Sequence, residues 1–377
     1  MSGPLEGLKV VELAGIGPGP YACMLLADLG ADVLRLERGD ATARRESSWD
    51  LLNRSRFSVA VDLKNSAGRD VVLELCERAD ALVEGFRPGV VERLGLGPDD
   101  VWRRNPRLVY ARMTGYGQDG PLAQRAGHDI NYIAISGALW PLGRAGERPV
   151  PPLNLVGDFG GGSLFLVMGI LAAVLSARTT GVGQVVDAAM VDGSASLLAM
   201  THSFLNAGFW HEERGVNILD TGAHFYEVYE TKDERYVAVG AIEAKFYDEL
   251  VRTLGLKNDD LPPQMDRSRW PEMKATFAAT FATKTRDEWT AIFADIDACV
   301  TPVLSPREAA AHPYNTARAV FETGEVVQPR PAPRFSKTPA QIGIAPHAAG
   351  SGTREGLEQW GISAARQDEL REQGAFG

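Results

Sequence analysis

The sequence predicts an α/β protein built from a large doubly wound domain and a smaller α+β domain. Its 377 residues are enough for a large core and are typical of two domains. Residues 8–113 alternate short apolar β-rich runs with amphipathic helical stretches, which is the pattern of repeated βαβ units. From residue 225 the pattern changes to short alternating strands joined by a turn, which is typical of a hairpin that opens a second domain.

The first βαβ unit occupies about thirty residues. Residues 8–13 form an apolar strand, and a turn rich in glycine and proline follows at 14–20. A helix is predicted over 21–29 because Ala22, Leu25 and Leu26 fall on one helical face, and a second strand is predicted over 31–36. The pattern continues with further strands at 58–63, 81–84, 108–113 and 184–191, and with helices at 67–79, 90–94, 163–177 and 194–209.

The second part of the chain predicts a hairpin at 226–231 and 235–241, helices at 245–254, 270–281 and 286–294, and a strand at 299–304. A proline-rich stretch at 328–333 predicts a linker that returns to the first domain, and the small polar residues at 339–352 predict a mobile tail. The predicted boundaries are therefore a large domain at 1–190, a linker at 191–224, a small domain at 225–320, and a return linker with a C-terminal segment of the large domain at 321–377.

Composition excludes several classes of protein. A net charge of −10 argues against a nucleic-acid partner. Three widely spaced cysteines form neither a disulfide framework nor a zinc pattern. The N-terminus lacks a secretory signal pattern, and the apolar run at 163–177 is too short to span a bilayer. We expect a cytoplasmic protein with no membrane partner.

Two side chains able to carry a proton, His128 and Asp158, each stand where a loop meets an apolar helical run. Histidine ordinarily titrates near neutrality, and burial between apolar segments raises a carboxyl pKa toward the same range. Taken singly, such a histidine is more often structural, and an aspartate before glycines is more often a helix N-cap. The pair predicts proton transfer.

The turn at 14–20 does not predict a dinucleotide site. Pro20 precedes the helix, and the spacing departs from G-x-G-x-x-G. Arginines at the ends of predicted strands, among them Arg38, Arg87 and Arg93, instead favour a smaller phosphorylated ligand, because a guanidinium fork fits phosphate.

Several motifs in order resemble one family, the type III coenzyme A transferases, and within it the branch of 2-methylacyl-CoA racemases. The resemblance extends over about residues 5–337. It is carried by the segments at 8–13, 29–33, 62–64, 84–90, 92–97, 114–117, 127–129, 157–162 and 240–243. Any one of these segments alone is weak, but the ordered series is specific.

The resemblance implies an interlocked homodimer, in which each chain has a Rossmann-like large domain and a small domain. CoA would lie with its phosphates at Arg38, Arg87 and Arg93 and its adenine near Ile16, Val61 and Leu63. Asp129 and Tyr132 would lie near the pantetheine, with further substrate contacts at Asp62, Lys64, Gly85 and Gly127.

The racemase resemblance assigns proton transfer at the carbon next to a thioester to His128 and Asp158. Glu243 of the partner subunit would orient His128. A helix starting at Phe159 would aim the backbone N–H groups of Asp158, Phe159 and Gly160 at the enolate oxygen. No metal or redox cofactor is expected, because the thioester itself stabilises the carbanion.

Two other functions compete with the racemase. In a CoA transferase, Asp158 would be the nucleophile, and neither His128 nor Glu243 would be needed. A non-catalytic acyl-CoA-binding protein would tolerate the loss of His128 and Asp158. Met168, Met190 and Met200 either line an acyl-chain surface or pack in the core, and the sequence does not decide between these.

Overall fold

The computed structural model describes residues 3–39, 49–257 and 261–376, which divide into two compact units. Unit 1 contains residues 1–136, 153–197 and 318–377, and unit 2 contains residues 137–152 and 198–317.

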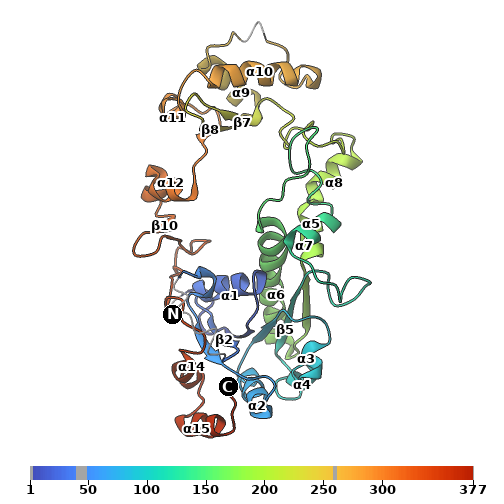
Figure 1. Cartoon of the computed structure of the whole chain (residues 1–377), viewed down its shortest axis with the longest axis vertical. Coiled ribbons are helices and arrows are strands. Elements are labelled where there is room, and N and C mark those ends of the chain that lie inside the picture. Colours follow the sequence, from blue (N-terminus) through green and yellow to red (C-terminus); the bar gives the residue numbers. More distant parts are fainter. Residues whose placement is uncertain (1–2, 40–48, 258–260, 377) are drawn as a thin grey trace. The chain divides into compact units, whose positions relative to one another are not determined.

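Unit 1 is built on a parallel six-stranded sheet in the order β3-β2-β1-β4-β5-β6 (Figure 1). This is the strand order of a Rossmann-type doubly wound fold. Strands β1 to β3 are added toward one edge of the sheet and β4 to β6 toward the other, so the neighbours β1 and β4 form the topological switch point. The strands are β1 (Lys9–Leu13), β2 (Asp32–Glu37), β3 (Phe57–Ala60), β4 (Ala81–Glu84), β5 (Val109–Thr114) and β6 (Val185–Ala189).

Helices cover both faces of this sheet, because successive strand residues point to opposite sides. Val10 belongs to the core beneath α1 and α6, whereas Val11 belongs to the core beneath α2 and α14. The helices of unit 1 are α1 (Pro18–Asp28), α2 (Ser66–Cys76), α3 (Val90–Arg93), α4 (Pro98–Trp102), α5 (Asp129–Ile135), α6 (Phe165–Thr180), α7 (Met190–Leu197), α14 (Thr353–Gln359) and α15 (Ala364–Glu372).

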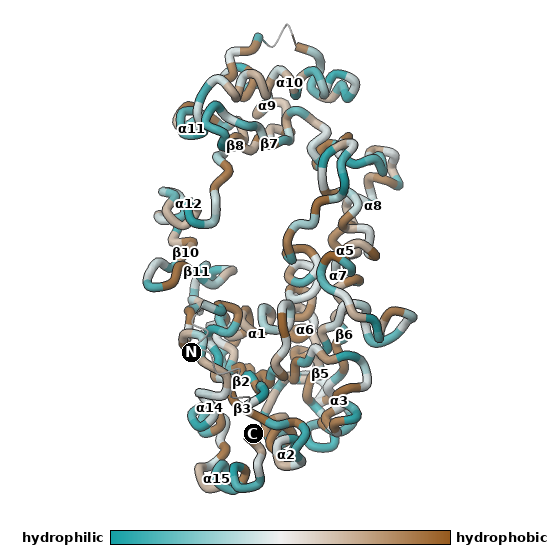
Figure 2. The backbone as a smooth tube through the Cα atoms, viewed as in Figure 1, coloured by the Kyte–Doolittle hydropathy of each residue, from teal (hydrophilic) through white to brown (hydrophobic). Residues whose placement is uncertain are grey.

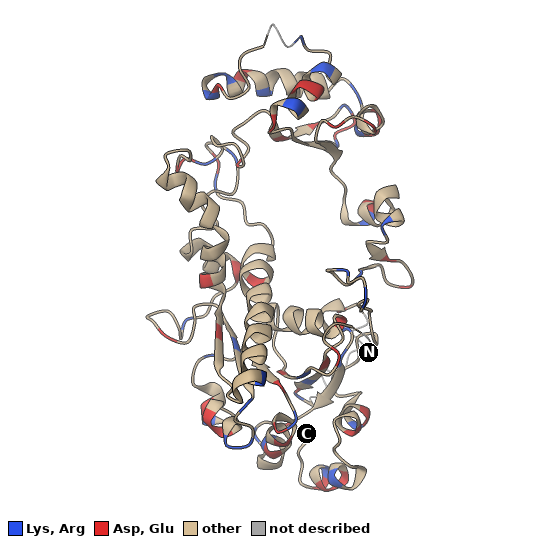
Figure 3. Cartoon of the chain, turned by 180° about the vertical axis from the view of Figure 1, so that it is seen from behind, with Lys and Arg blue, Asp and Glu red and all other residues tan. Residues whose placement is uncertain are grey.

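The apolar helix predicted at 163–177 is longer than expected. A π-helix, η2 (Leu155–Leu164), runs directly into α6, and together they form a helix long and apolar enough by length and composition to cross a membrane. The expectation that this run is too short for a bilayer was therefore wrong. Leu166, Ile170 and Val174 pack into the core, and α6 carries charge only at its C-terminal end (Figures 2 and 3).

The final segment of the chain packs on unit 1. Ser55 donates its N–H to the Ile344 carbonyl (2.7 Å), and Gly350 donates to the Ser58 hydroxyl (2.7 Å). Near the end, Asp62 donates its N–H to the Ala375 carbonyl (2.8 Å). The tail at 339–352, predicted to be mobile, is thus tied to the β3 edge of the sheet by backbone hydrogen bonds. Its composition gave no sign of these partners.

Unit 2 contains an antiparallel three-stranded sheet in the order β7-β8-β9, packed against helices (Figure 1). An aromatic core that includes Phe225, Trp270 and Phe277 joins the sheet to α9 and α10. Its elements are α8 (Ala199–Asn206), β7 (Tyr226–Glu230), β8 (Tyr236–Gly240), α9 (Ala244–Thr253), η4 (Arg267–Arg269), α10 (Trp270–Phe281), α11 (Arg286–Phe293), β9 (Val300–Pro302), α12 (Pro306–Ala311) and α13 (Pro313–Ala317). After unit 2 the chain returns to unit 1 with a short hairpin, β10 (Phe321–Glu322) and β11 (Gln328–Pro329). Unit 1 also contains the 3-10 turn η1 (Leu51–Asn53).

The units differ in detail from the predicted boundaries. The segment predicted as a linker at 191–224 contains most of α7 and all of α8. Residues 137–152, predicted within the large domain, belong to unit 2, where Arg144 pairs with Glu227 (2.7 Å). Sequence pattern could not show this, because it is a contact between residues more than eighty positions apart.

Candidate active site

A cavity of about 560 Å³ opens at the carboxyl ends of β1, β4 and β5 in unit 1. It therefore lies at the topological switch point, where open α/β sheets bind their ligands. Its walls come from the glycine- and proline-rich turn after β1, from the segments that follow β4 and β5, and from the loop that leads into α5. His128 and Asp158 both line it.

His128 stands immediately before α5, where the chain changes from extended to helical. Its N–H donates to the Asn131 side chain (3.0 Å), and its carbonyl accepts the Asn131 N–H (2.8 Å). These two bonds fix the backbone at the helix start, while the imidazole itself is exposed toward the cavity. The position suits a side chain that exchanges protons with a ligand.

Asp158 projects from the π-helix η2 and is not the helix N-cap that its sequence position allows. The helix is held in place by its neighbours: Ser163 donates its hydroxyl hydrogen to the Pro18 carbonyl (2.7 Å), and the Phe159 ring packs on Tyr21 with centroids 4.3 Å apart. Gly193 of α7 lies so close to η2 that a Cβ there would come within 1.8 Å of the Gly161 carbonyl oxygen. Close packing thus fixes the segment that carries the carboxyl.

Partial burial raises the pKa of the Asp158 carboxyl above its ordinary value. The hydrogen bond from the Asn154 amide (3.2 Å) opposes that rise, the negative charge of Asp129 adds to it, and His128 acts weakly in the other direction. The net direction is the one a general base requires, because a carboxyl with a raised pKa binds a proton more readily.

A second cavity, of about 320 Å³, adjoins the first. The two share Leu13, Ala14 and Phe86 as lining residues. The second cavity lies at the carboxyl ends of β1, β2 and β3, and five of the predicted CoA residues line it: Arg38, Val61, Asp62, Leu63 and Lys64. The predicted residues Gly85, Arg87, Gly127 and Tyr132 line the cavity of His128 and Asp158.

Three of the predicted substrate residues do not line the cavity of Arg38 and Lys64. Ile16, placed by the prediction beside Val61 and Leu63, lines the cavity of His128 instead. Arg93 is exposed on α3 and lines neither cavity. Asp129, predicted near the pantetheine, is buried and accepts the Asp158 N–H on its carboxylate (2.7 Å).

The predicted backbone donors for an enolate oxygen are already engaged. The helical segment begins at Leu155 and not at Phe159, so Phe159 donates its N–H to the Asn154 carbonyl (3.3 Å). The Asp158 N–H is taken by Asp129. Gly160 lies inside the π-helix, where an added Cβ would come within 3.0 Å of the Leu155 carbonyl oxygen. The prediction of free N–H groups at the start of a helix was wrong because the helix begins four residues earlier, at Leu155, so these N–H groups lie within it.

Glu243 belongs to unit 2, where it is exposed at the start of α9. Its carbonyl accepts the N–H groups of Phe246 and Tyr247 (both 3.0 Å). Its side chain makes no capping bond to α9, and its charge reaches Cys299, whose thiol pKa is raised by burial, by Asp297 and by Glu243. The carboxylate is therefore presented on the surface of unit 2.

Comparison with known proteins agrees with the sequence motifs. The sequence model of CoA-transferase family III matches residues 5–351. The chain belongs to CoA-transferase family III. Two curated alpha-methylacyl-CoA racemases, from Mus musculus and Homo sapiens, are each 48% identical to it over 362 and 364 residues, which is 95% of this chain and 94% of each relative.

Two solved structures share the fold of this chain. A CaiB/BaiF family protein from Brucella suis superposes with a TM-score of 0.81 over 96% of this chain and all of that one, at 24% identity. Rv3272 from Mycobacterium tuberculosis gives a TM-score of 0.76 at 28% identity, covering 94% of this chain and 99% of that one. These likenesses confirm the predicted mixed α/β fold with its parallel sheet.

The cavity of His128 and Asp158 includes residues that the sequence did not single out. Tyr116 lines the wall and packs edge-on against Tyr132 with centroids 4.9 Å apart. Glu84 also lines the cavity; its carboxylate accepts the Phe86 N–H (2.7 Å), and burial raises its pKa to about 7.

Asn154 donates a side-chain hydrogen bond to the Asp158 carboxylate. Asn154 precedes Asp158 by four residues, a spacing that brings two side chains together on a helix. The sequence predicted no helix over 155–164, so it did not indicate this contact. Of the three methionines, Met190 lines the cavity, whereas Met168 and Met200 are exposed.

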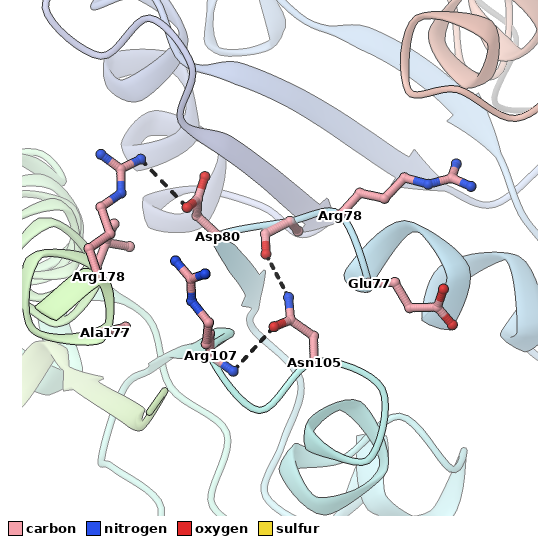
Figure 4. A pocket seen from close by; sticks show the side chains of 9 residues that line it. Glu77, Arg78, Asp80, Asn105, Arg107, Ala177 and Arg178 are labelled. Carbon is pink, nitrogen blue, oxygen red and sulfur yellow. Dashed lines mark hydrogen bonds and ion pairs between the residues drawn. The ribbon is translucent and has the colours of Figure 1, made fainter. Parts of the chain in front are cut away.

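A third pocket of unit 1, of about 210 Å³, lies at the amino ends of β4 and β5, at the end of the strands away from His128 and Asp158 (Figure 4). Asp80 directly precedes β4, and Arg107 lies just before β5, so the pocket faces the amino ends of the strands. Its polar groups largely bind one another: Arg178 pairs with Asp80 (3.5 Å), and Asn105 donates to the Ala79 carbonyl (2.9 Å). Position and internal pairing both set this pocket apart from the site of chemistry.

Proposed function

We propose that this chain interconverts the 2R and 2S forms of 2-methylacyl-CoA thioesters, by removing the proton next to the thioester on one face and returning a proton on the other. The predicted racemase is supported by two curated relatives with this activity in their names, each 48% identical over 95% of the chain. The observation that carries the proposal within the structure is that His128 and Asp158 line one cavity at the switch point of the sheet.

The proposed reaction moves two protons at one carbon. Ionised Asp158 takes the proton from the α-carbon, and the electron pair of the broken C–H bond passes to the thioester oxygen to give an enolate. Protonated His128 then delivers its proton to the other face of the same carbon, and the roles reverse for the opposite enantiomer. Each group supplies about 10²–10⁴-fold of the rate as a positioned acid or base. The raised pKa of Asp158 makes that carboxylate the stronger base.

We place CoA along the two adjoining cavities. The nucleotide end belongs in the cavity of Arg38 and Lys64, where two cations meet phosphate and Val61 and Leu63 offer apolar walls. The thioester end belongs in the cavity of His128 and Asp158, and Arg87 lies on the wall there. The reaction needs no metal or redox cofactor, because the thioester delocalises the charge. We place the enzyme in the cytoplasm.

Two copies of the chain form the working enzyme. One face of the continuous helix formed by η2 and α6 exposes an apolar stripe, Leu164, Met168 and Leu175, at spacings of four and seven residues. These side chains are 52–70% exposed in the single chain, and contiguous apolar surface of this kind marks an interaction site. A second copy, interlocked with the first as the family resemblance implies, covers this stripe. Glu243 of the partner subunit then orients the imidazole of His128.

Deuterium exchange tests the reaction. A single enantiomer of a 2-methylacyl-CoA is incubated in deuterated water without an acceptor acid. We expect racemisation with label at the α-carbon, and a loss of about 10²–10⁴-fold in His128→Gln and in Asp158→Asn. The exposed control Asp99→Asn keeps full exchange, and retained CoA affinity in the two variants shows that the cavities are intact.

The competing functions give other results. A CoA transferase, with Asp158 as nucleophile, puts no label at the α-carbon under either condition, and it transfers CoA only when an acceptor acid is added. A binding protein shows CoA affinity with no exchange under either condition. Exchange that survives the loss of both side chains contradicts the two-base mechanism.

The shared site is tested by mixing chains. His128→Ala and Glu243→Ala chains are each weakly active alone. If Glu243 acts across the dimer, a mixed dimer holds one site that lacks both groups and one that is complete. Random reassortment then restores about a quarter of the wild-type sites, because half the dimers are mixed. No restoration after demonstrated subunit exchange contradicts the arrangement.

A further inference from the structure

The carboxylate of Asp129 connects the two segments that carry the proposed proton-transfer groups. It directly follows His128 in the chain and is the first residue of α5. Its Oδ2 accepts the backbone N–H of Asp158 at 2.7 Å, across 29 positions of sequence. A single side chain thus joins the start of α5 to the π-helix.

The contact is built with little tolerance. Asp129 is only 6% exposed, and Gly157 lies directly against its carboxylate. A Cβ at position 157 would come within 2.5 Å of Oδ2, which no real structure accommodates without a shift. The other oxygen, Oδ1, is buried and has no partner among the described residues. Leaving a buried carboxylate oxygen unpaired is costly, so a purely structural origin is a poor explanation.

We propose that Asp129 is a positioning residue, whose buried carboxylate holds the peptide N–H of Asp158 and so fixes that carboxyl on the cavity wall shared with His128. This deepens the proposed function and rests on it for its catalytic consequence. The contact itself is a property of the free protein. The charge of Asp129 also acts on the Asp158 carboxyl, adding to the rise in its pKa that burial causes. The other groups that face Asp158 are Asn154, His128 and the Tyr132 hydroxyl, whose own pKa is raised by burial, by Tyr116 and by Asp158.

Two variants separate the hydrogen bond from the charge. Asp129→Asn keeps an oxygen that accepts the Asp158 N–H but removes the charge, whereas Asp129→Ala removes both. The matched control is Asp187→Asn, because the Asp187 carboxylate also accepts a backbone N–H, that of Gln118 at 2.9 Å, away from the cavity lining.

The first measurements need no substrate. Amide hydrogen exchange at Asp158 is expected to rise about tenfold or more in Asp129→Ala and to stay slow in Asp129→Asn and Asp187→Asn. Carbon-13 titration of the Asp158 carboxyl, assigned with Asp158→Asn, is expected to move to lower pH in Asp129→Asn and to stay in place in Asp187→Asn. Unchanged amide exchange in Asp129→Ala, or an unchanged titration in Asp129→Asn, overturns the proposal. Should Asp129→Ala fail to fold, the titration of Asp129→Asn decides alone.

Activity gives the third readout. We expect Asp129→Ala to lower the rate of α-proton exchange about 10²-fold with little change in CoA affinity, since misplacing a catalytic group by about 1 Å costs that much. In Asp129→Asn the acidic limb of the pH–rate profile moves to lower pH. A wild-type protein without any α-proton exchange refutes the proposed function, and the two substrate-free measurements still decide the role of Asp129.

Discussion

Replacing Glu84 by glutamine is expected to change how stability depends on pH. Glu84 lies at the carboxyl end of β4, is 2% exposed, and accepts the Phe86 N–H at 2.7 Å. Burial raises its pKa to about 7; the bond from Phe86 and the charge of Arg112 oppose this, and Glu92 and Asp187 add to it. The folded protein therefore holds a proton at Glu84 that the unfolded chain releases at lower pH.

The magnitude follows from the two pKa values. Between an ordinary value of 4.5 and about 7, the preference of the folded state for the neutral form is worth about 3 kcal/mol. This stabilisation is fully present below pH 4.5 and is lost as the pH rises through about 7. Between pH 5.5 and pH 8 the loss amounts to about 2 kcal/mol. Glutamine stays neutral and can still accept the Phe86 N–H, so the variant lacks this dependence.

The assay is urea unfolding of the wild type and of Glu84→Gln at fixed protein concentration. We expect the stability of the variant relative to wild type to rise by about 2 kcal/mol between pH 5.5 and pH 8. Glu77→Gln is the control, because Glu77 is also in unit 1 but pairs with Arg104 at the surface. A difference between wild type and Glu84→Gln that is the same at both pH values refutes the reasoning.

Three further predictions concern other parts of the chain. Gly157→Ala places a Cβ within 2.5 Å of the Asp129 carboxylate; we expect α-proton exchange to fall about 10²-fold with CoA affinity retained, as measured by deuterium uptake and calorimetry. His224, buried against Tyr247 with its pKa lowered to about 4, stabilises the protein above pH 6.5; urea unfolding of wild type should show about 2 kcal/mol more acid destabilisation between pH 7 and pH 5 than His224→Gln. Met168→Asp puts a charge into the apolar stripe of α6, and light scattering should show the mass of one chain where the wild type shows two; an unchanged dimer contradicts that interface.

Elements with a strong local pattern were predictable from the sequence. The strand at 81–84 and the helix at 270–281 have the predicted ends, because the first is a short buried run that stops at Gly85 and the second keeps its helical periodicity throughout. The helical run around Asp158 was not predictable in the same way. Three successive glycines at 160–162 indicate a loop by local propensity, and here helices α1 and α7 pack against the segment and hold it in a π-helix.

The residues of the candidate site likewise differ in whether local sequence predicts their role. His128 and Asp158 could be named from residue type and motif, since an imidazole and a carboxyl beside apolar helices are the groups proton transfer requires. The role of Asp129 could not, because it depends on one hydrogen bond between segments 29 residues apart. For the same reason the sequence assigned free N–H groups to Asp158 and Phe159, whose partners appear only in three dimensions.

A carboxyl that removes a proton from carbon must meet two opposing demands. It has to be dry enough for its pKa to rise, and open enough to touch the substrate. Asp158 meets both demands from its place in the glycine-rich helix η2. The glycines beside it have no side chains, so α5 and α7 pack closely against η2 and exclude water on that side. The other side of the carboxyl lines the cavity. Larger residues in η2 would push those helices away and return water to the carboxyl. The glycines beside Asp158 therefore act on its basicity through packing, and not by leaving backbone donors free.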